Sequence, residues 1–426
     1  MSSSSQTSDN DEDYYDDSDS SNSSKKKHKK KSKKPKKPKK SKKSKKSKKS
    51  KKSKKSKNKK KKKNRKKTIK KSVHLIVKSE DWITEYGKKG ANPKEFDRFE
   101  NTNYFKEKFV GNDYVIFAGK HPKKGILIFC VLELKEQKEF LVLLVSKSIN
   151  KLFTVQKKDL KIGLFKNMCK PSNLTKIISK YDPKMSGIQD IIDMDPEAEE
   201  KEILSLEDEQ NLNNFKVGVI YVKPNQTTEN DFFQNQKGSE AFKKFLKILG
   251  EKIKLKNFYK YSGGLDIEND YDGKYAIYNT YENYEFLFHV STFLPFDKFD
   301  KQQISRKRHI GNDIVVIAFL DGEVQYDPRC FTSQQNHIHI CVQPNTDEIE
   351  SDKLFYKVEV ARKNYVDDFK PNIPKPSLFS EDEILNFLLL KIISGEKTVK
   401  NSGPYQRRIE NSRVSKLEMI YESYDD

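Results

Sequence analysis

A lysine-rich run limits what this chain of 426 residues can fold into. Residues 25–71 hold 33 of the 86 Lys and Arg residues and no acidic residue. Such a run buries too little apolar surface to offset its conformational entropy, so we expect residues 1–72 to form a disordered tail. The folded part must come from residues 73–426, a length that suits two domains of ordinary size.

The excess positive charge belongs to that tail. The formal net charge of the chain is +24. Residues 1–24 hold 7 of the 62 acidic residues, so residues 72–426 keep 53 basic and 55 acidic residues, a net charge of about −2. The Lys-rich run can act as a nuclear address, bind RNA or attach to anionic lipid. It can equally be a solubilising tail, because polylysine attracts any polyanion without selecting one.

The cysteines and the apolar segments indicate a reducing compartment. Cys130, Cys169, Cys330 and Cys341 lie far apart and form no CxxC pair. The N-terminus lacks the apolar segment of a secretory signal, and no window approaches about 18 uncharged apolar residues. We expect a cytoplasmic protein that anionic membranes attract through its basic tail, with a nuclear location as the alternative.

The first folded segment has the pattern of antiparallel strands. Residues 98–165 contain YVIFAG, ILIFCVLEL and EFLVLLVS, joined by short loops. Residues 172–181 are predicted to form a helix, and the acidic stretch at 190–210 has the composition of a domain boundary. We therefore predict a mainly antiparallel β domain over residues 73–204.

The second segment alternates strands with helices. FKVGVIYV is a continuous apolar run, typical of a strand buried on both faces. The helix EAFKKFLKILG and the strands EFLFHVS, IVVIAFL and HIHICVQ follow it. SEDE predicts a capping box before ILNFLLLKII, a helix that we expect to end at Gly395, and a last helix is expected over 404–424. This pattern predicts an α/β domain over residues 205–422.

The chain is poor in motifs for a catalytic centre of its own. It has no GxxxxGK[ST] loop, so we expect no nucleotide site, and it has no GxSxG. HIHIC places His337, His339 and Cys341 on one face of a strand, but the rest of a tetrahedral metal set is missing. ENDYDG, at 268–273, lacks the bidentate Glu of a calcium loop and is expected to be a surface turn. We expect no metal and no cofactor.

The sequence RKRHIGNDIV, at residues 306–315, places a polar cluster directly before an apolar run. A helix that begins near Asp300 and ends near Gly311 would carry Arg308, His309 and Asn312 on one face. Gly311 would let the chain turn there.

This cluster has an ordinary explanation as well as a functional one. The cations Arg306, Lys307 and Arg308 suit the last turn of a helix because they offset its dipole. That explanation fits His309 and Asn312 less well, since neither carries a fixed charge. Asn can also cap the C-terminus of a helix, so the pattern alone leaves both functions of Asn312 open.

Several segments, taken in order, resemble the catalytic domain of the Rap-type GTPase-activating proteins. They are FKVGVIYVKPNQTTENDFF, GSEAFKKFLKILGEKIKLKNFYKYSGGLD, FLFHVSTFLPF and KQQISRKRHIGNDIVVIAF. The residues upstream resemble the smaller domain that precedes the catalytic one in Rap-specific members, so the resemblance covers roughly residues 98–422. It implies a β domain that forms homodimers, and a catalytic α/β domain resembling the fold of a small GTPase.

The resemblance implies a protein that stimulates GTP hydrolysis by a Rap-like small GTPase in its GTP form. In this family an asparagine, the "asparagine thumb", enters the nucleotide site of the partner, and Asn312 matches that position. Arg306, Lys307, Arg308 and His309 match the part of the signature that supports the thumb and contacts the GTPase. The GTP and Mg²⁺ would belong to the partner, so this chain would not be an NTPase itself.

A carboxamide suits this task because its oxygen accepts and its NH₂ donates, so it can hold a water and touch a phosphate oxygen together.

Two alternatives stay open: a catalytically inactive GTPase-binding scaffold, and a polyanion or nucleic-acid binder that acts through the tail. One position departs from the family: Ser262 stands before GGLD, where members often carry Arg. That difference bears on affinity for the partner, and the sequence does not identify the GTPase.

Overall fold

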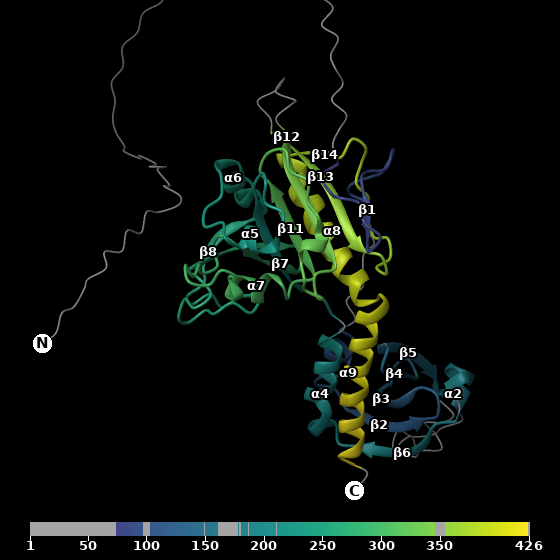
Figure 1. The fold of residues 1–426 in the computed structure, drawn as a ribbon. Helices are drawn as coiled ribbons and strands as arrows, with labels where there is room; N and C mark the ends of the chain where they lie inside the picture. Colours follow the sequence, from purple (N-terminus) through teal and green to yellow (C-terminus); the bar gives the residue numbers. More distant parts are fainter. Residues whose placement is uncertain are drawn as a thin grey trace, which may run out of the picture. The chain divides into compact units, whose positions relative to one another are not determined.

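The computed structural model describes residues 74–96, 103–148, 150–160, 178, 180–185, 187–209, 211–345 and 354–424. The predicted disordered tail, residues 1–72, and most of the predicted helix at 172–181 lie outside the described residues. The described strands form two sheets, one of nine strands and one of five (Figure 1). Among the described residues, none of the helices combines the length and the apolar character needed to cross a bilayer.

The nine-stranded sheet follows the order β1-β13-β12-β11-β7-β10-β9-β8, and β14 pairs with β13. The central strands β12, β11, β7 and β10 run parallel to one another, and the outer pairs are antiparallel. The bounds are β1 Trp82–Glu85, β7 Asn214–Val222, β8 Glu251–Lys254, β9 Tyr275–Tyr281, β10 Tyr284–Val290, β11 Val315–Leu320, β12 Ile338–Asn345, β13 Phe355–Lys363 and β14 Leu378–Ser380.

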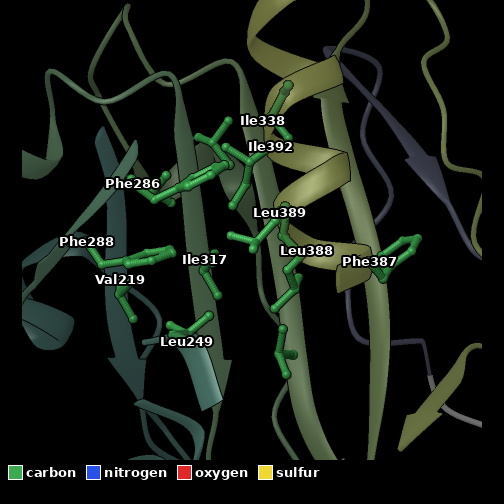
Figure 2. Packing of buried hydrophobic residues seen from close by; sticks show 14 of the residues in the cluster. Val219, Leu249, Phe286, Phe288, Ile317, Ile338, Phe387, Leu388, Leu389 and Ile392 are labelled. Atoms are coloured by element: carbon green, nitrogen blue, oxygen red, sulfur yellow. The ribbon is translucent and has the colours of Figure 1, made fainter. Parts of the chain in front are cut away.

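Both faces of this sheet are covered, which explains the continuous apolar runs in its parallel strands. On one face α6 (Glu240–Leu249) and α8 (Glu381–Lys400) pack onto residues such as Ile317 of β11. Figure 2 shows Leu388, Leu389 and Ile392 of α8 among the residues of this cluster. On the other face α5 (Glu229–Phe233) and α7 (Ile304–Ile310) pack with Val316 of β11. The predicted α/β layer with buried strands is confirmed.

The five-stranded sheet follows the order β5-β4-β3-β2-β6, with every neighbouring pair antiparallel. Its strands are β2 Tyr114–His121, β3 Gly125–Leu134, β4 Glu139–Val145, β5 Asn150–Gln156 and β6 Gln189–Met194. Side chains of α1 (Tyr104–Lys108), α4 (Pro196–Asp208) and α9 (Gly403–Glu422) join one of its two apolar clusters. Two short helices, α2 (Lys157–Leu160) and η2 (Pro183–Met185), also belong to this part of the chain. The predicted antiparallel strands are confirmed.

Both ends of the described chain pack differently from the predicted domains 73–204 and 205–422. The N-terminal strand β1 pairs with β13 of the nine-stranded sheet, and the Glu359 carboxylate accepts hydrogen bonds from Leu75 N at 2.9 Å and Ile76 N at 3.1 Å. The C-terminal helix α9 buries Leu417 and Tyr421 in the core of the five-stranded sheet. A sequence pattern predicts a strand or a helix, but it does not say which sheet that element joins.

Two expected helix ends are wrong. Helix α7 begins at Ile304 and not near Asp300, although the Asp300 carboxylate does accept from Ile304 N at 2.7 Å. Helix α8 has the predicted capping box at Ser380 and Glu383, but it continues through Gly395 to Lys400. A Cβ on Gly395 would lie 2.6 Å from Ile338 Cδ1, so this glycine permits close helix-to-sheet packing rather than ending the helix.

We predict that Gly395→Val destabilises the protein. The added side chain would overpack the contact with Ile338 and Phe369, at a cost of about 1–3 kcal/mol. Urea denaturation would measure the loss, with Ser415→Val at an exposed position of α9 as the control. Equal stability of both variants would mean that α8 does not approach β12 this closely.

Candidate functional site

The candidate site is the turn that joins α7 to β11. Gly311 N donates to Lys307 O at 2.7 Å, Asn312 N to His309 O at 3.0 Å, and Asp313 N to Ile310 O at 3.2 Å. The turn therefore continues the last turn of α7 and delivers the chain into β11, between β7 and β12 in the sheet. A side chain on this turn is attached to the most completely buried part of the fold.

Asn312 is exposed on this turn. Its Nδ2 donates a hydrogen bond of 2.8 Å to Arg308 O, which caps a carbonyl at the end of the helix. Among the described residues no donor bonds to its Oδ1. The carboxamide therefore has one end held by the helix and an acceptor available to a partner, so capping and function do not exclude each other.

Gly311 has a different role from the expected one. Its φ is −65°, an ordinary helical value, so the turn does not need the conformational freedom of glycine. A Cβ at this position would lie 2.5 Å from Lys307 O, which leaves no room for any other residue. The expectation that Gly311 allows the chain to turn is thus replaced by a requirement for close packing.

Arg306 is buried beneath α7, with 1% of its surface exposed. Its guanidinium donates to Phe233 O at 2.7 Å and Asn235 O at 2.8 Å, and to Leu294 O and Pro295 O on the segment after β10. Desolvation lowers the pKa of Arg306 to about 10, so it remains a cation at neutral pH. It can support the site but cannot touch a partner.

Lys307 and Arg308 each pair with an acid from another segment. Lys307 Nζ lies 3.2 Å from Glu229 Oε2 on α5. Arg308 Nη2 donates to Asp272 Oδ1 at 2.9 Å, while 63% of the Arg308 side chain stays exposed. Of the four predicted supporting residues, Arg308 is thus the one that presents most surface beside Asn312.

His309 faces inward rather than sharing an exposed face with Arg308 and Asn312. Its Nε2 lies 2.7 Å from Asp272 Oδ1, and its side chain is buried. Desolvation lowers the pKa of His309 below its usual range, although the hydrogen bond to Asp272 opposes that shift. Because a carboxylate only accepts hydrogen bonds, we assign the hydrogen of this contact to His309 Nε2, which donates to Asp272 Oδ1.

Sequence reasoning missed several residues that hold the turn. Asp272 belongs to the segment that was expected to be only a surface turn, and Asp313 follows Asn312 directly. The Asp313 carboxylate lies 2.8 Å from His289 Nδ1, and both side chains are fully buried. Asn336 Nδ2 donates to Ile310 O at 2.9 Å and to Asp313 O at 2.6 Å. A histidine inside an apolar strand, as in EFLFHVS, was the available signal.

The strand HIHIC contributes to the core. His339 Nδ1 lies 2.8 Å from the Tyr326 hydroxyl, and its ring packs edge-on against Trp82. Within the described ranges no three His, Cys, Asp or Glu side chains gather in a way that could hold a metal ion. His339 therefore has a structural role, in a polar contact inside an apolar cluster.

Comparison with known proteins identifies the class of this domain. Residues 232–414 match the family model described as Rap/ran-GAP. The range contains α7, the Asn312 turn and β11, so the site lies inside a Rap/ran-GAP domain.

Curated relatives support this class. The "GTPase-activating Rap/Ran-GAP domain-like protein 3" of Homo sapiens is 39% identical over 228 residues, which are 53% of this chain and 22% of that protein. A PH and Rap-GAP domain-containing protein of Dictyostelium discoideum is 33% identical over 335 residues, 77% of this chain and 28% of that protein. The solved TSC2 GAP domain shares 32% identity over 44% of this chain and 97% of that chain, with a TM-score of 0.40.

This chain is a Rap-GAP domain protein. It spans between 22% and 28% of the length of the two curated relatives above.

We predict that Arg306 and Arg308 differ sharply in their effect on stability. Arg306→Met would leave four carbonyl groups, three of them in buried hydrogen bonds, without this donor and should lower the free energy of unfolding by about 3 kcal/mol or more. Arg308→Met changes a largely exposed side chain on the same helix and should cost less than about 1 kcal/mol. Urea denaturation would compare the two, and equal losses would contradict the buried position of Arg306.

We also predict that stability falls as the pH falls from about 6.5 toward 4. Burial lowers the pKa of His337 to about 4 and of His339 to about 3, so below pH 6.5 the unfolded chain binds more protons than the folded one. Each histidine then lowers the free energy of unfolding by up to about 1.4 kcal/mol for each unit by which the pH falls. Urea denaturation at several pH values would give the slope of the free energy of unfolding against pH. This slope should be shallower for His339→Phe than for the wild type, and an unchanged slope would contradict a lowered pKa of His339 in the folded protein.

Proposed function

We propose that this protein is a GTPase-activating protein for a Rap-like small GTPase in its GTP form, and that Asn312 acts as its asparagine thumb. The observation that carries the proposal is an exposed carboxamide on a turn that is fixed at both ends. Its Nδ2 is bonded to Arg308 O, and the turn runs directly into the buried strand β11. The matched family and the names of the relatives support the same class of activity.

The chemistry requires positioning more than covalent participation. Hydrolysis of GTP passes through a state in which the attacking water must be in line and the phosphate oxygens stabilised. The Oδ1 of Asn312 can accept a hydrogen from that water, and the amide hydrogen that does not cap Arg308 O can point to a phosphate oxygen. The carboxamide is neutral, so it brings no negative charge close to the triphosphate and needs no shift in pKa.

The outer face of α7 is suited to contact a partner protein. Ile304, Arg308 and Asn312 follow one another at i, i+4 and i+8, and all three are exposed. Ile304 is 61% exposed, and Phe299 just before the helix is 83% exposed. Large apolar side chains beside an exposed cation are typical of interaction surfaces, so this face supports docking of a protein next to Asn312.

We predict that Asn312→Ala abolishes stimulated GTP hydrolysis while the protein still folds. Loss of a positioned catalytic group should lower the stimulated kcat by about 100-fold or more, with little change in KM. Phosphate release from a GTP-loaded Rap-like GTPase, with and without the protein, would measure it.

Arg308→Ala separates this proposal from an arginine-finger mechanism, in which that substitution would be the more damaging one. Wild-type kcat in Asn312→Ala would overturn the thumb assignment. A wild-type protein that binds the GTPase without accelerating hydrolysis would instead be the inactive scaffold.

Other expectations from the sequence stay predictions. They are a homodimer formed through the five-stranded unit, contact of residues 25–71 with anionic membranes or other polyanions, and a cytoplasmic or nuclear location. GTP and Mg²⁺ are expected to come with the partner and not with this chain. Deletion of residues 1–72 should spare catalysis in solution, whereas a polyanion binder would lose its function.

A further inference from the structure

We infer that His289 and Asp313 are positioning residues for Asn312, a role that rests on the proposed function. The Asp313 carboxylate lies 2.8 and 3.1 Å from His289 Nδ1, and neither side chain is exposed to solvent. Asp313 follows Asn312 directly, so the bond to His289 fixes the backbone on the C-terminal side of the Asn312 carboxamide. A displacement of about 1 Å in a catalytic group can cost about 100-fold in rate, so such a constraint matters.

The order of the strands explains how this pair can form. His289 lies on β10 and Asp313 precedes β11, and β7 runs between these two strands. His289 is paired in register with Gly218 of β7, which is in turn paired with Val316 of β11. A Cβ on Gly218 would lie 2.9 Å from Ile310 Cγ2 and 3.3 Å from Asp313 Oδ2. Glycine at this position therefore leaves the space that the pair crosses.

His289 also contacts the turn from its N-terminal side. The ring of His309, on the last turn of α7, packs edge-on against the ring of His289 with centroids 5.6 Å apart. His289 thus touches a residue three positions before Asn312 and bonds to the residue after it. The same imidazole restrains both sides of the exposed asparagine.

A glycine of the GGLD segment packs closely against the other side of His289. Gly263 has a φ of +64°, and a Cβ there would lie 3.0 Å from His289 Nε2 and 2.7 Å from Leu287 Cδ2. His289 Nε2 is buried and has no hydrogen-bond partner among the described residues. The ring therefore makes its polar contact through Nδ1, and only a glycine fits against its far edge.

Two further bonds restrain the carbonyls of the turn. Asn336 Nδ2 bonds to Ile310 O and Asp313 O, and the Ser333 hydroxyl donates to Gly311 O. These contacts hold the backbone, whereas the His289–Asp313 pair connects the turn to a strand two positions away in the sheet. We therefore expect His289 to determine the orientation of the turn and not only its local conformation.

The test is a double-mutant cycle with Asn312→Ala. His289→Phe keeps a ring of similar size but removes the donor to Asp313, and it should lower the stimulated kcat by about tenfold or more with KM nearly unchanged. In the Asn312→Ala background the same substitution should cause no further loss of the residual rate. Asp313→Asn, which keeps an oxygen that accepts from Nδ1–H, should retain more activity than Asp313→Ala.

His339→Phe is the matched control. His339 is an equally buried histidine on a strand of the same sheet, but its hydrogen bond is to Tyr326 and not to the turn. It should lower stability and keep the kcat. The positioning role is overturned if His289→Phe keeps a normal kcat, or if it lowers the rate equally with and without Asn312. No stimulation by the wild type would instead overturn the proposed function, and this role with it.

Discussion

The complete burial of β11 is the constraint on which the rest of the site depends. Its six residues are enclosed by β7 and β12 and covered on both faces of the sheet. Each large side chain in such a strand contributes about 1.5–3 kcal/mol through removal from water, so the strand has little freedom to shift. The residues of the turn immediately before β11 are therefore also restrained. An exposed side chain placed there has a defined position without needing a large enclosing pocket.

Buried polar groups then fix what apolar packing cannot. Burying the Arg306 cation and the His289–Asp313 pair costs desolvation energy, and a hydrophobic contact would stabilise the fold at lower cost. Hydrogen bonds are directional, however, and in a low dielectric a wrong geometry leaves a group unpaired at high cost. These groups therefore make the fold less stable than apolar packing would, but they define one orientation of α7 and of the turn that follows it. This is the property that a positioned carboxamide needs.

The sequence predicted the elements well because hydrophobic periodicity and caps are local signals. The buried face of α6, the capping box at Ser380 and the continuous apolar strands were all predictable in this way. The partners of β1 and α9 were not, because which sheet an element joins is decided by contacts distant in sequence. The glycines were misread for a related reason. Gly311 and Gly395 look like a turn and a helix end, but each is required by an atom of another residue that comes too close for a Cβ.

The cluster RKRHIGND also shows how far a motif can predict a site. The motif singled out Asn312 as a candidate, and in the structure Asn312 and Arg308 are both exposed at the end of α7. It gave no sign that Arg306 is buried or that His309 turns inward to Asp272, since neighbouring residues on a short helix point in different directions. Of the four consecutive polar residues 306–309, Arg308 thus remains largely exposed to a partner, while the others mainly hold the helix in place. Substitutions that preserve charge at different positions of this cluster would therefore not be equivalent, because burial separates these roles and charge does not.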